Sequence, residues 1–225
     1  LWTPDKDGHY EDIVLGYNNI DNYINNPGER FLGAVVGPYA NRIAGGTYTI
    51  GEETYSFPQN NNGQTLHGGL IGLDMVVWNV EKVTDSSIVL SYLRPDGQEG
   101  MPGNLNILMT YTLTPENEFR IDYVAETDKA THVNISHHSF FNLKGEGNGT
   151  ITDNVMVINA SHTTPVDSFL IPSGEVAEVT GTPFDFRTPK AIGQDINQDY
   201  DQLVLGNGYD HNWVLNTAGD INKLA

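Results

Sequence analysis

The chain has 225 residues with 29 acidic and 11 basic side chains, which gives a formal net charge of −18. This excess of negative charge repels phosphate backbones and anionic lipid surfaces, so we expect neither nucleic acid nor a membrane as a partner. The chain has no cysteine, which excludes disulfides, thiolate metal sites and a thiol nucleophile. Its length is sufficient for one domain with a full hydrophobic core.

The predicted elements are short strands separated by turns. Glycine is abundant, at 24 residues, and several Asn-Gly and Asp-Gly pairs favour tight turns. Apolar and polar residues alternate most clearly over 105–125, where a turn at 115–118 joins two arms into a β-hairpin. We therefore predict an all-β, antiparallel sandwich with long functional loops. In chain order, we expect a helix over 20–26 and strands over 47–50, 88–93, 105–113, 119–125, 132–141, 155–159 and 212–215.

Four short motifs concentrate polar side chains of the kind that act in catalysis. Each is also consistent with a structural role: an ion pair for Arg42, a turn position for His67 and a turn or cap position for Asp210. The motifs are Tyr39-Ala40-Asn41-Arg42-Ile43, Leu66-His67-Gly68-Gly69, Ser136-His137-His138 and Gly208-Tyr209-Asp210-His211-Asn212.

The adjacent histidines, His137 and His138, fall within an expected strand. Successive side chains of a strand point to opposite faces, so the two rings cannot share one environment. His137 falls on the same face as Ile135 and Phe141, and we expect it to pack as a neutral interior ring. His138 falls on the more polar face with Ser136, which makes it the better catalytic candidate.

Several kinds of chemistry lack their sequence patterns. The histidines show no paired metal-ligand spacing, and neighbours on a strand cannot converge on one ion, so we predict no zinc site. There is no nucleophile elbow, phosphate-binding loop or dinucleotide fingerprint. The remaining His, Asp, Arg and Asn side chains, with aromatic neighbours, suit a hydroxyl-rich sugar. Acidic loops leave calcium binding open.

At these motifs the sequence resembles the aldose 1-epimerase family. The resemblance runs in family order over nearly the whole chain. It implies a galactose mutarotase-like β-supersandwich, present in part, and one aldose 1-epimerase domain over 1–225 that is truncated at both ends. The matching segments are Pro4-Asp5-Lys6-Asp7-Gly8, Tyr39-Ala40-Asn41-Arg42-Ile43, Leu66-His67-Gly68-Gly69 with Gly72 and Trp78, Pro95-Asp96-Gly97, Glu99-Gly100, Pro102-Gly103-Asn104-Leu105, His138-Ser139-Phe140-Phe141-Asn142-Leu143 and Tyr209-Asp210-His211-Asn212.

The resemblance implies an enzyme that interconverts the α and β anomers of aldohexoses such as galactose and glucose, with no cofactor required. By position, His138 corresponds to the general acid at the ring oxygen. Arg42, His67 and Asp210 correspond to substrate-binding residues, with Asn41 beside them. Mutarotation needs such an acid and also a base at the C1 hydroxyl, and a histidine, which titrates near neutrality, suits the acid role.

The chain departs from the family pattern at three positions near these motifs. His137 stands where the family commonly has Asn, Phe140 where Tyr is common, and Pro38 where Arg is common. The family's catalytic base is a glutamate that lies beyond the Asp210 motif, and no glutamate of this chain falls in a matching motif. We therefore expect the 225-residue chain alone to be inactive or nearly so.

Two other functions are left open by the sequence. One is a non-catalytic carbohydrate-binding β-sandwich, and the other is a hexose-6-phosphate 1-epimerase, which would need a basic cluster for its phosphate. With 11 basic residues and no visible cluster, the phosphate substrate is disfavoured. We expect a monomer whose partner is a small sugar. We expect a cytoplasmic location, with the periplasm as the alternative.

Overall fold

The computed structural model describes residues 1–25 and 28–217. The chain divides into two compact units, Leu1–Phe141 and Asn142–Ala225. Every strand pair in the ladders described is antiparallel. The prediction of one domain over 1–225 stays a prediction.

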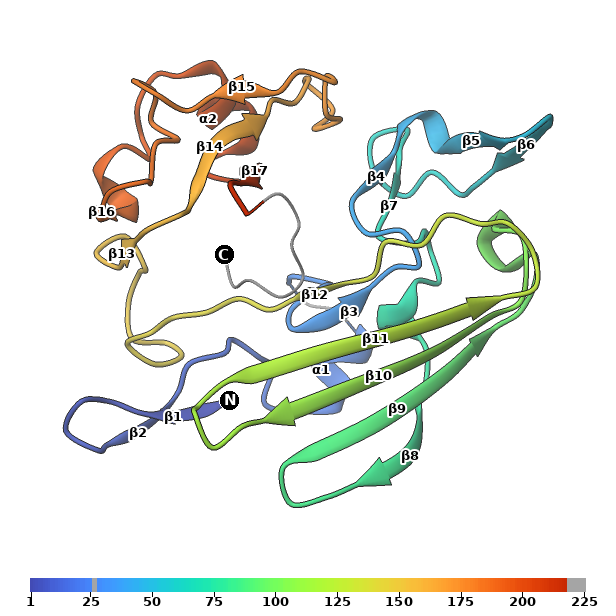
Figure 1. Cartoon of the computed structure of the whole chain (residues 1–225), viewed down its shortest axis with the longest axis horizontal. Helices are drawn as coiled ribbons and strands as arrows, with labels where there is room; N and C mark the ends of the chain where they lie inside the picture. The colour runs from blue at the N-terminus through green and yellow to red at the C-terminus, as the bar shows by residue number, and fades with distance from the viewer. Residues whose placement is uncertain (26–27, 218–225) are drawn as a thin grey trace. The chain divides into compact units, whose positions relative to one another are not determined.

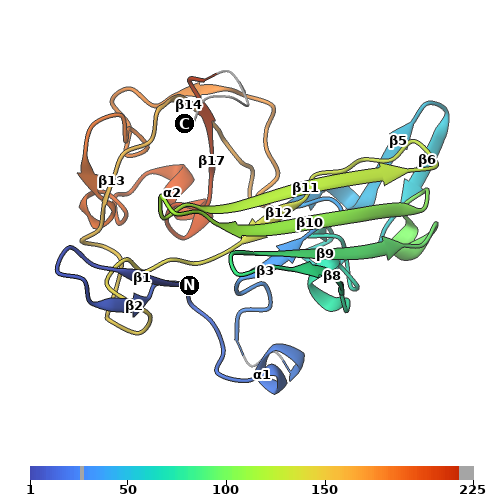
Figure 2. The same cartoon turned by 60° about the horizontal axis from the view of Figure 1, so that its bottom comes forward.

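The largest sheet of the first unit has four strands in the order β11-β10-β9-β8 (Figure 1). The predicted hairpin, β10 and β11, forms one side of this sheet, with a register that runs from Leu113 opposite Phe119 to Leu105 opposite Thr127. Seen from another side, β10 lies between β9 and β11 (Figure 2). The strands are β8 (Asn79–Val83), β9 (Ser87–Arg94), β10 (Leu105–Leu113) and β11 (Phe119–Thr127).

The hydrophobic core of the first unit lies against one face of this sheet. Leu105, Ile107 and Met109 alternate along β10 and are fully buried, together with Val35 and Leu73 from other segments. Burying an aliphatic side chain of this size contributes about 1.5–3 kcal/mol. The alternation in the sequence therefore identified the buried face correctly.

Short two-stranded ladders make up the rest of the first unit and pair β1 with β2, β3 with β12, β4 with β7, and β5 with β6. The helix predicted over 20–26 is confirmed for residues 20–25. Position 26 lies outside the described residues. The elements are β1 (Trp2–Pro4), β2 (Tyr10–Asp12), α1 (Ile20–Asn25), β3 (Ala34–Val36), β4 (Arg42–Ile43), η1 (Ala44–Gly46), β5 (Thr47–Ile50), β6 (Glu53–Ser56), β7 (Thr65–Leu66), η2 (Leu73–Met75), η3 (Gln98–Gly100) and β12 (Ser136–His138).

The second unit has a three-stranded sheet, β15-β14-β17, and a two-stranded ladder, β13-β16. Its core consists of Val179, Phe184 and Leu203, with the rings of Tyr209 and Trp213 packed against them. The elements are β13 (Val155–Met156), β14 (Ala160–Thr164), β15 (Ala177–Glu178), β16 (Lys190–Ala191), η4 (Ile192–Gln194), α2 (Asp201–Gly206) and β17 (Asn212–Leu215).

Two predicted strands are much shorter than the sequence pattern suggested. The strand expected over 132–141 is confined to β12, which pairs with β3. Pro38 follows β3 by two residues and has no backbone N–H with which to extend the ladder. The strand expected over 155–159 is confined to β13. In its partner β16, the residue next to Lys190 is Pro189, and the ladder ends there.

No helix within the described ranges has the length and apolar character of a bilayer-spanning segment.

Candidate functional site

Strand pairing brings His138 into a cluster of rings in the first unit. In the β12–β3 ladder His138 lies opposite Ala34. The centroid of the His138 ring is 5.1 Å from that of His67, with the two rings nearly perpendicular. The rings of Phe31 and Phe140 lie 5.8 and 5.0 Å from it. Within the described part of the chain, the His138 side chain has no hydrogen bond or ion pair, so both ring nitrogens are available to a ligand.

His137 lies on the opposite face of β12, as strand alternation predicted. Its ring is perpendicular to that of Tyr111, with the centroids 5.5 Å apart, and its Nδ1 lies 2.6 Å from the Ser139 hydroxyl. Burial lowers the pKa of His137, and the neighbouring charge of His138 lowers it further. The prediction that Phe141 shares this interior is wrong: β12 ends at His138, and Phe141 is 44% exposed.

His67 is fixed by reciprocal hydrogen bonds with Asn41, one residue beyond the β4–β7 ladder. The His67 N–H donates to the Asn41 carbonyl, and the Asn41 N–H donates to His67 Nδ1, both over 3.0 Å. Both residues adopt left-handed backbone conformations, with φ of 52° and 63°. Because Nδ1 accepts a hydrogen bond, the proton of the neutral ring resides on Nε2. His67 therefore offers an N–H donor.

Burial and nearby positive charge keep the His67 ring neutral. Burial lowers the pKa of His67 to about 4, with further contributions from the charges of His138, Arg42 and Arg30. At neutral pH His67 is thus a hydrogen-bond donor and not an acid. Of the two facing rings, His67 is therefore the one that is held neutral.

The Arg42 guanidinium lies beside the same pair of residues. Its Nη1 donates to Asn41 Oδ1 over 3.3 Å and its Nε donates to Asn61 Oδ1 over 3.1 Å. Arg42 is half-buried, and both of these acceptors are neutral amides. The structure therefore brings together four of the five residues predicted from the sequence: Asn41, Arg42, His67 and His138.

Asp210, the fifth predicted residue, belongs to the second unit. It is exposed and lies between α2 and β17, two residues after Gly208. Its carboxylate has no hydrogen-bond or ion-pair partner among the residues that the structure describes. It is thus available as an acceptor for ligand hydroxyls.

The aromatic residues around Asp210 have structural roles in the second unit. The Tyr209 hydroxyl donates to the Pro183 carbonyl over 3.0 Å, and Trp213 Nε1 donates to the Phe184 carbonyl over 3.0 Å. Burial raises the pKa of Tyr209 to about 12 and lowers the pKa of His211. Burial thus disfavours the charged forms of Tyr209 and His211.

Sequence reasoning missed Arg30 and Phe31, which precede β3. Arg30 Nε donates to Asp74 Oδ2 over 2.7 Å, and the guanidinium lies 4.9 Å from the centroid of the Phe31 ring. Burial raises the pKa of Asp74, and the Arg30 contact acts in the opposite direction. The only signal in the sequence was a basic residue next to an aromatic one in a chain poor in basic residues.

The cluster is suited to a polyhydroxylated ligand. It combines a neutral N–H donor at His67, a cationic donor at Arg42 and an unpartnered imidazole at His138, with Phe31 and Phe140 beside them. Sugar hydroxyls need such donors and acceptors, and sugar C–H faces pack on aromatic rings. In the described ranges, no three His, Asp or Glu side chains are grouped so that they could hold a metal ion.

Comparison with known proteins identifies the family of the chain. The aldose 1-epimerase family model matches residues 1–225. The galactose mutarotase of Bos taurus is 40% identical over 215 residues, which are 96% of this chain and 60% of that protein. The aldose 1-epimerase of Escherichia coli is 36% identical over 222 residues, which are 99% of this chain and 63% of that protein. The chain thus spans about 60% of the length of the curated relatives it matches.

A solved structure shows the same fold. The galactose 1-epimerase from Lactobacillus acidophilus superimposes with a TM-score of 0.81 at 36% identity, over 93% of this chain and 61% of that one. This similarity confirms the galactose mutarotase-like, antiparallel all-β fold class that was predicted.

Proposed function

The chain belongs to the aldose 1-epimerase family, and we propose that its protein interconverts the α and β anomers of aldohexoses such as galactose and glucose. The observation that supports this best is the pairing of His138 with His67: a ring with two unpartnered nitrogens lies 5.1 Å from a ring that is held neutral. One ring can move a proton while the other binds substrate.

In the proposed reaction His138 donates a proton to the ring oxygen of the sugar as the bond from that oxygen to C1 breaks. A base removes the proton of the C1 hydroxyl, and C1 becomes an aldehyde. Rotation about the C1–C2 bond then presents the other face of the aldehyde to the hydroxyl. On reclosure the hydroxyl oxygen attacks C1 and returns its proton to His138, while the base returns its proton to the oxygen on C1, which gives the other anomer. We assign the base to no residue of this chain.

The remaining residues bind and orient the sugar. His67 donates from Nε2 to a sugar oxygen, and the positive charge of Arg42 stabilises negative charge that develops on oxygen. Asn41 supports both side chains through its backbone N–H and its amide oxygen. Asp210 accepts hydrogen bonds from sugar hydroxyls.

Polarimetry with α-galactose or α-glucose tests this function, on the polypeptide encoded by the whole reading frame. His138→Ala should slow anomer exchange about 10²- to 10⁴-fold, as expected for the loss of a positioned acid. His137→Ala is the matched control, because that ring faces the β10–β11 hairpin, and it should cost much less. Equal losses in the two variants would contradict the assignment of His138. If the parent protein does not accelerate anomer exchange above the rate in buffer alone, the proposed function is contradicted.

The 225-residue chain by itself has a second candidate function, sugar binding without catalysis. This is favoured by its span of about 60% of the matched relatives and by the lack of a glutamate in a matching base motif. Saturable galactose binding by the isolated chain, with anomer exchange at the buffer rate, would support it. A hexose 6-phosphate remains the weaker substrate candidate, because Arg30 is already paired with Asp74. Competition between galactose and glucose 6-phosphate tests that substrate.

We further propose that the reaction is cofactor-independent and is carried out by a monomer in the cytoplasm. The acid–base chemistry uses side chains alone, which supports the first point. An exchange rate unchanged by EDTA is the expected result, and a loss that calcium restores would contradict it. Light scattering after gel filtration tests the monomer, and cell fractionation distinguishes cytoplasm from periplasm.

A further inference from the structure

The peptide group of Leu70, three residues after His67, is bound by charged side chains at both of its polar atoms. Glu99 Oε2 accepts a hydrogen bond from the Leu70 N–H over 2.6 Å. Arg30 Nη2 donates to the Leu70 carbonyl over 3.0 Å. Hydrogen bonds to charged groups are stronger than neutral ones, so these two contacts fix the chain just beyond His67.

A third side chain holds the same segment on the other side of His67. Asn60 Oδ1 accepts from the Leu66 N–H over 2.7 Å, and Asn60 Nδ2 donates to the carbonyls of Leu66 and Gly69 over 3.0 and 2.9 Å. The segment from Leu66 to Leu70 is therefore held by side chains from three distant positions. Regular strand pairing ends at Leu66.

The glycines after His67 make room for these contacts. Gly69 has φ of +95°, and a Cβ at this position would overlap the Glu99 carboxylate. Gly68 has φ of +92°, and a Cβ there would overlap the Gly37 carbonyl. A side chain at position 69 would push Glu99 away from the Leu70 N–H, so Gly69 and Glu99 form one fitted arrangement.

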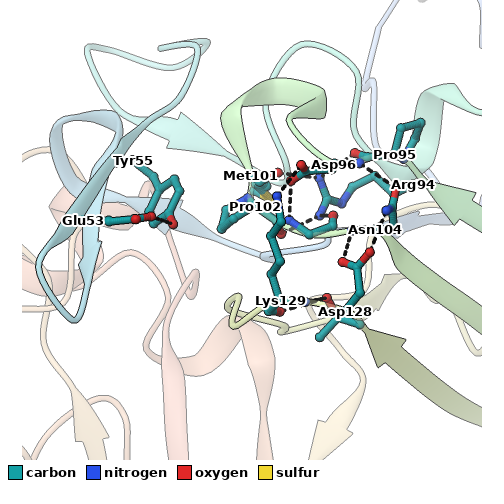
Figure 3. A network of polar contacts seen from close by, with 12 residues as sticks. Glu53, Tyr55, Arg94, Pro95, Asp96, Met101, Pro102, Asn104, Asp128 and Lys129 are labelled. Carbon is teal, nitrogen blue, oxygen red and sulfur yellow. Dashed lines mark hydrogen bonds and ion pairs between the residues drawn. The ribbon is translucent and has the colours of Figure 1, made fainter.

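The loop that carries Glu99 is itself fixed from inside by Arg94. The Arg94 side chain is 2% exposed, and its Nε is buried without a hydrogen-bond partner in the described part of the chain. Its guanidinium lies at the centre of the network in Figure 3. Nη1 and Nη2 donate to five backbone carbonyls of this loop, those of Pro95, Gln98, Met101, Pro102 and Gly103.

A second layer of contacts closes the same loop. Asp96 accepts from the Gly103 N–H over 2.6 Å and from Lys129 Nζ over 2.5 Å. Asn104 donates through its backbone N–H and its side-chain amide to Asp128, each over 2.7 Å (Figure 3). Glu99 thus projects from a loop whose conformation is set independently of the His67 segment.

We propose that Glu99 is a positioning residue for His67. By accepting the Leu70 N–H it sets the path of the His67 segment, and so keeps His67 Nδ1 in reach of the Asn41 N–H and the His67 ring against His138. Arg94 contributes indirectly, because it holds the loop that carries Glu99. The proposal rests on the proposed function in one respect, that His67 binds the sugar.

Two conservative variants of Glu99 distinguish the effect of side-chain length from that of side-chain charge. Glu99→Gln keeps the length of the side chain and an acceptor oxygen but loses the charge. Glu99→Asp keeps the charge but is one methylene too short to reach the Leu70 N–H. We expect Glu99→Asp to lower kcat/KM for galactose about 10-fold, because a small misplacement of a binding group is costly, and Glu99→Gln to stay close to the parent. Glu116→Asp is the control, because Glu116 lies exposed in the turn between β10 and β11.

A readout independent of catalysis is the imidazole nitrogen spectrum of His67, measured by NMR on the whole protein. The parent should show a neutral ring protonated at Nε2. Glu99→Asp should shift the His67 signals and admit the other tautomer, whereas Glu99→Gln and Glu116→Asp should not. Thermal unfolding of each variant shows whether the fold is retained.

The results for the two Glu99 variants either support or contradict the positioning role. Loss in Glu99→Asp with recovery in Glu99→Gln supports positioning. Loss in Glu99→Gln with a normal Glu99→Asp would mean that the charge matters, and equal behaviour of the two would mean that neither reach nor charge is specific. Either result overturns the proposal. If the parent protein does not exchange anomers, the proposed function fails, but the His67 spectrum still decides the positioning role.

Discussion

His67 and Asp210 are both proposed as sugar-binding residues, yet each is held very differently within its own unit. His67 exchanges two hydrogen bonds with Asn41, and its segment is bound by side chains from three other positions. Asp210 is exposed between α2 and β17, and its carboxylate has no partner in the described part of the chain. The first group contributes a fixed geometry, and the second an acceptor with its hydrogen-bonding capacity unused. Replacing them should therefore have consequences of different kinds.

The largest effect is expected from His67→Ala. The variant removes a donor to the substrate and also leaves the Asn41 N–H without its acceptor. We expect kcat/KM to fall about 10²-fold, the typical cost of one such donor. The free energy of unfolding should fall by about 1–3 kcal/mol, the cost of an unsatisfied polar group. Steady-state kinetics and urea unfolding measure the two effects, and a loss of activity with unchanged stability would show that Asn41 finds another partner.

A smaller and purely functional effect is expected from Asp210→Ala. No contact within the described residues is lost, so the free energy of unfolding should change by less than about 0.5 kcal/mol, as for ordinary surface substitutions. Loss of a charged acceptor should weaken sugar binding about 10-fold, seen mainly in KM. Unfolding curves and KM values for Asp210→Ala and the neighbouring control Asp201→Ala test this contrast. A clear fall in the free energy of unfolding of Asp210→Ala would contradict the expected difference between Asp210 and His67.

A further effect is a pH dependence of stability that His67 should produce. The pKa of His67 in the folded state is about 4, below its ordinary value of 6.5. Between these values the unfolded chain binds the proton more readily, so the free energy of unfolding should decline as the pH falls from about 6.5 to about 4. His137 and His211, whose pKa values are also lowered, act in the same direction.

Urea unfolding at pH 7 and pH 5 measures this decline. His67→Gln cannot take up the proton and should therefore lose less stability between the two pH values than the parent. An identical decline in the parent and in His67→Gln would show that other groups account for it.

The parts of the fold that could be predicted were those with a local pattern. Alternation over 105–125 gave the β10–β11 hairpin and its buried face, and alternation over the two histidines placed their rings on opposite sides. The lengths of β12 and β13 could not be predicted in this way. Each is limited by a proline next to its partner strand, and strand pairing is not visible in either segment alone.

Only the part of the candidate site that lies in local sequence motifs could be predicted. Asn41, Arg42, His67 and His138 were found through their motifs, and the structure brings these four together. The roles of Arg30, Asn60 and Glu99 could not be found, because their contacts are made to backbone atoms of a distant segment. A backbone acceptor or donor is present in every residue, so the sequence carries no mark of which one is bound.

Arg94 has a consequence for the behaviour of the Glu99 loop in acid. The outer contacts of the loop depend on Asp96 and Asp128, which lose their charge when they are protonated. Arg94 contacts only carbonyl oxygens, and neither a carbonyl nor a guanidinium changes its charge over that range. Acid should therefore loosen the outer layer of the loop, while the inner layer that Arg94 holds keeps its shape.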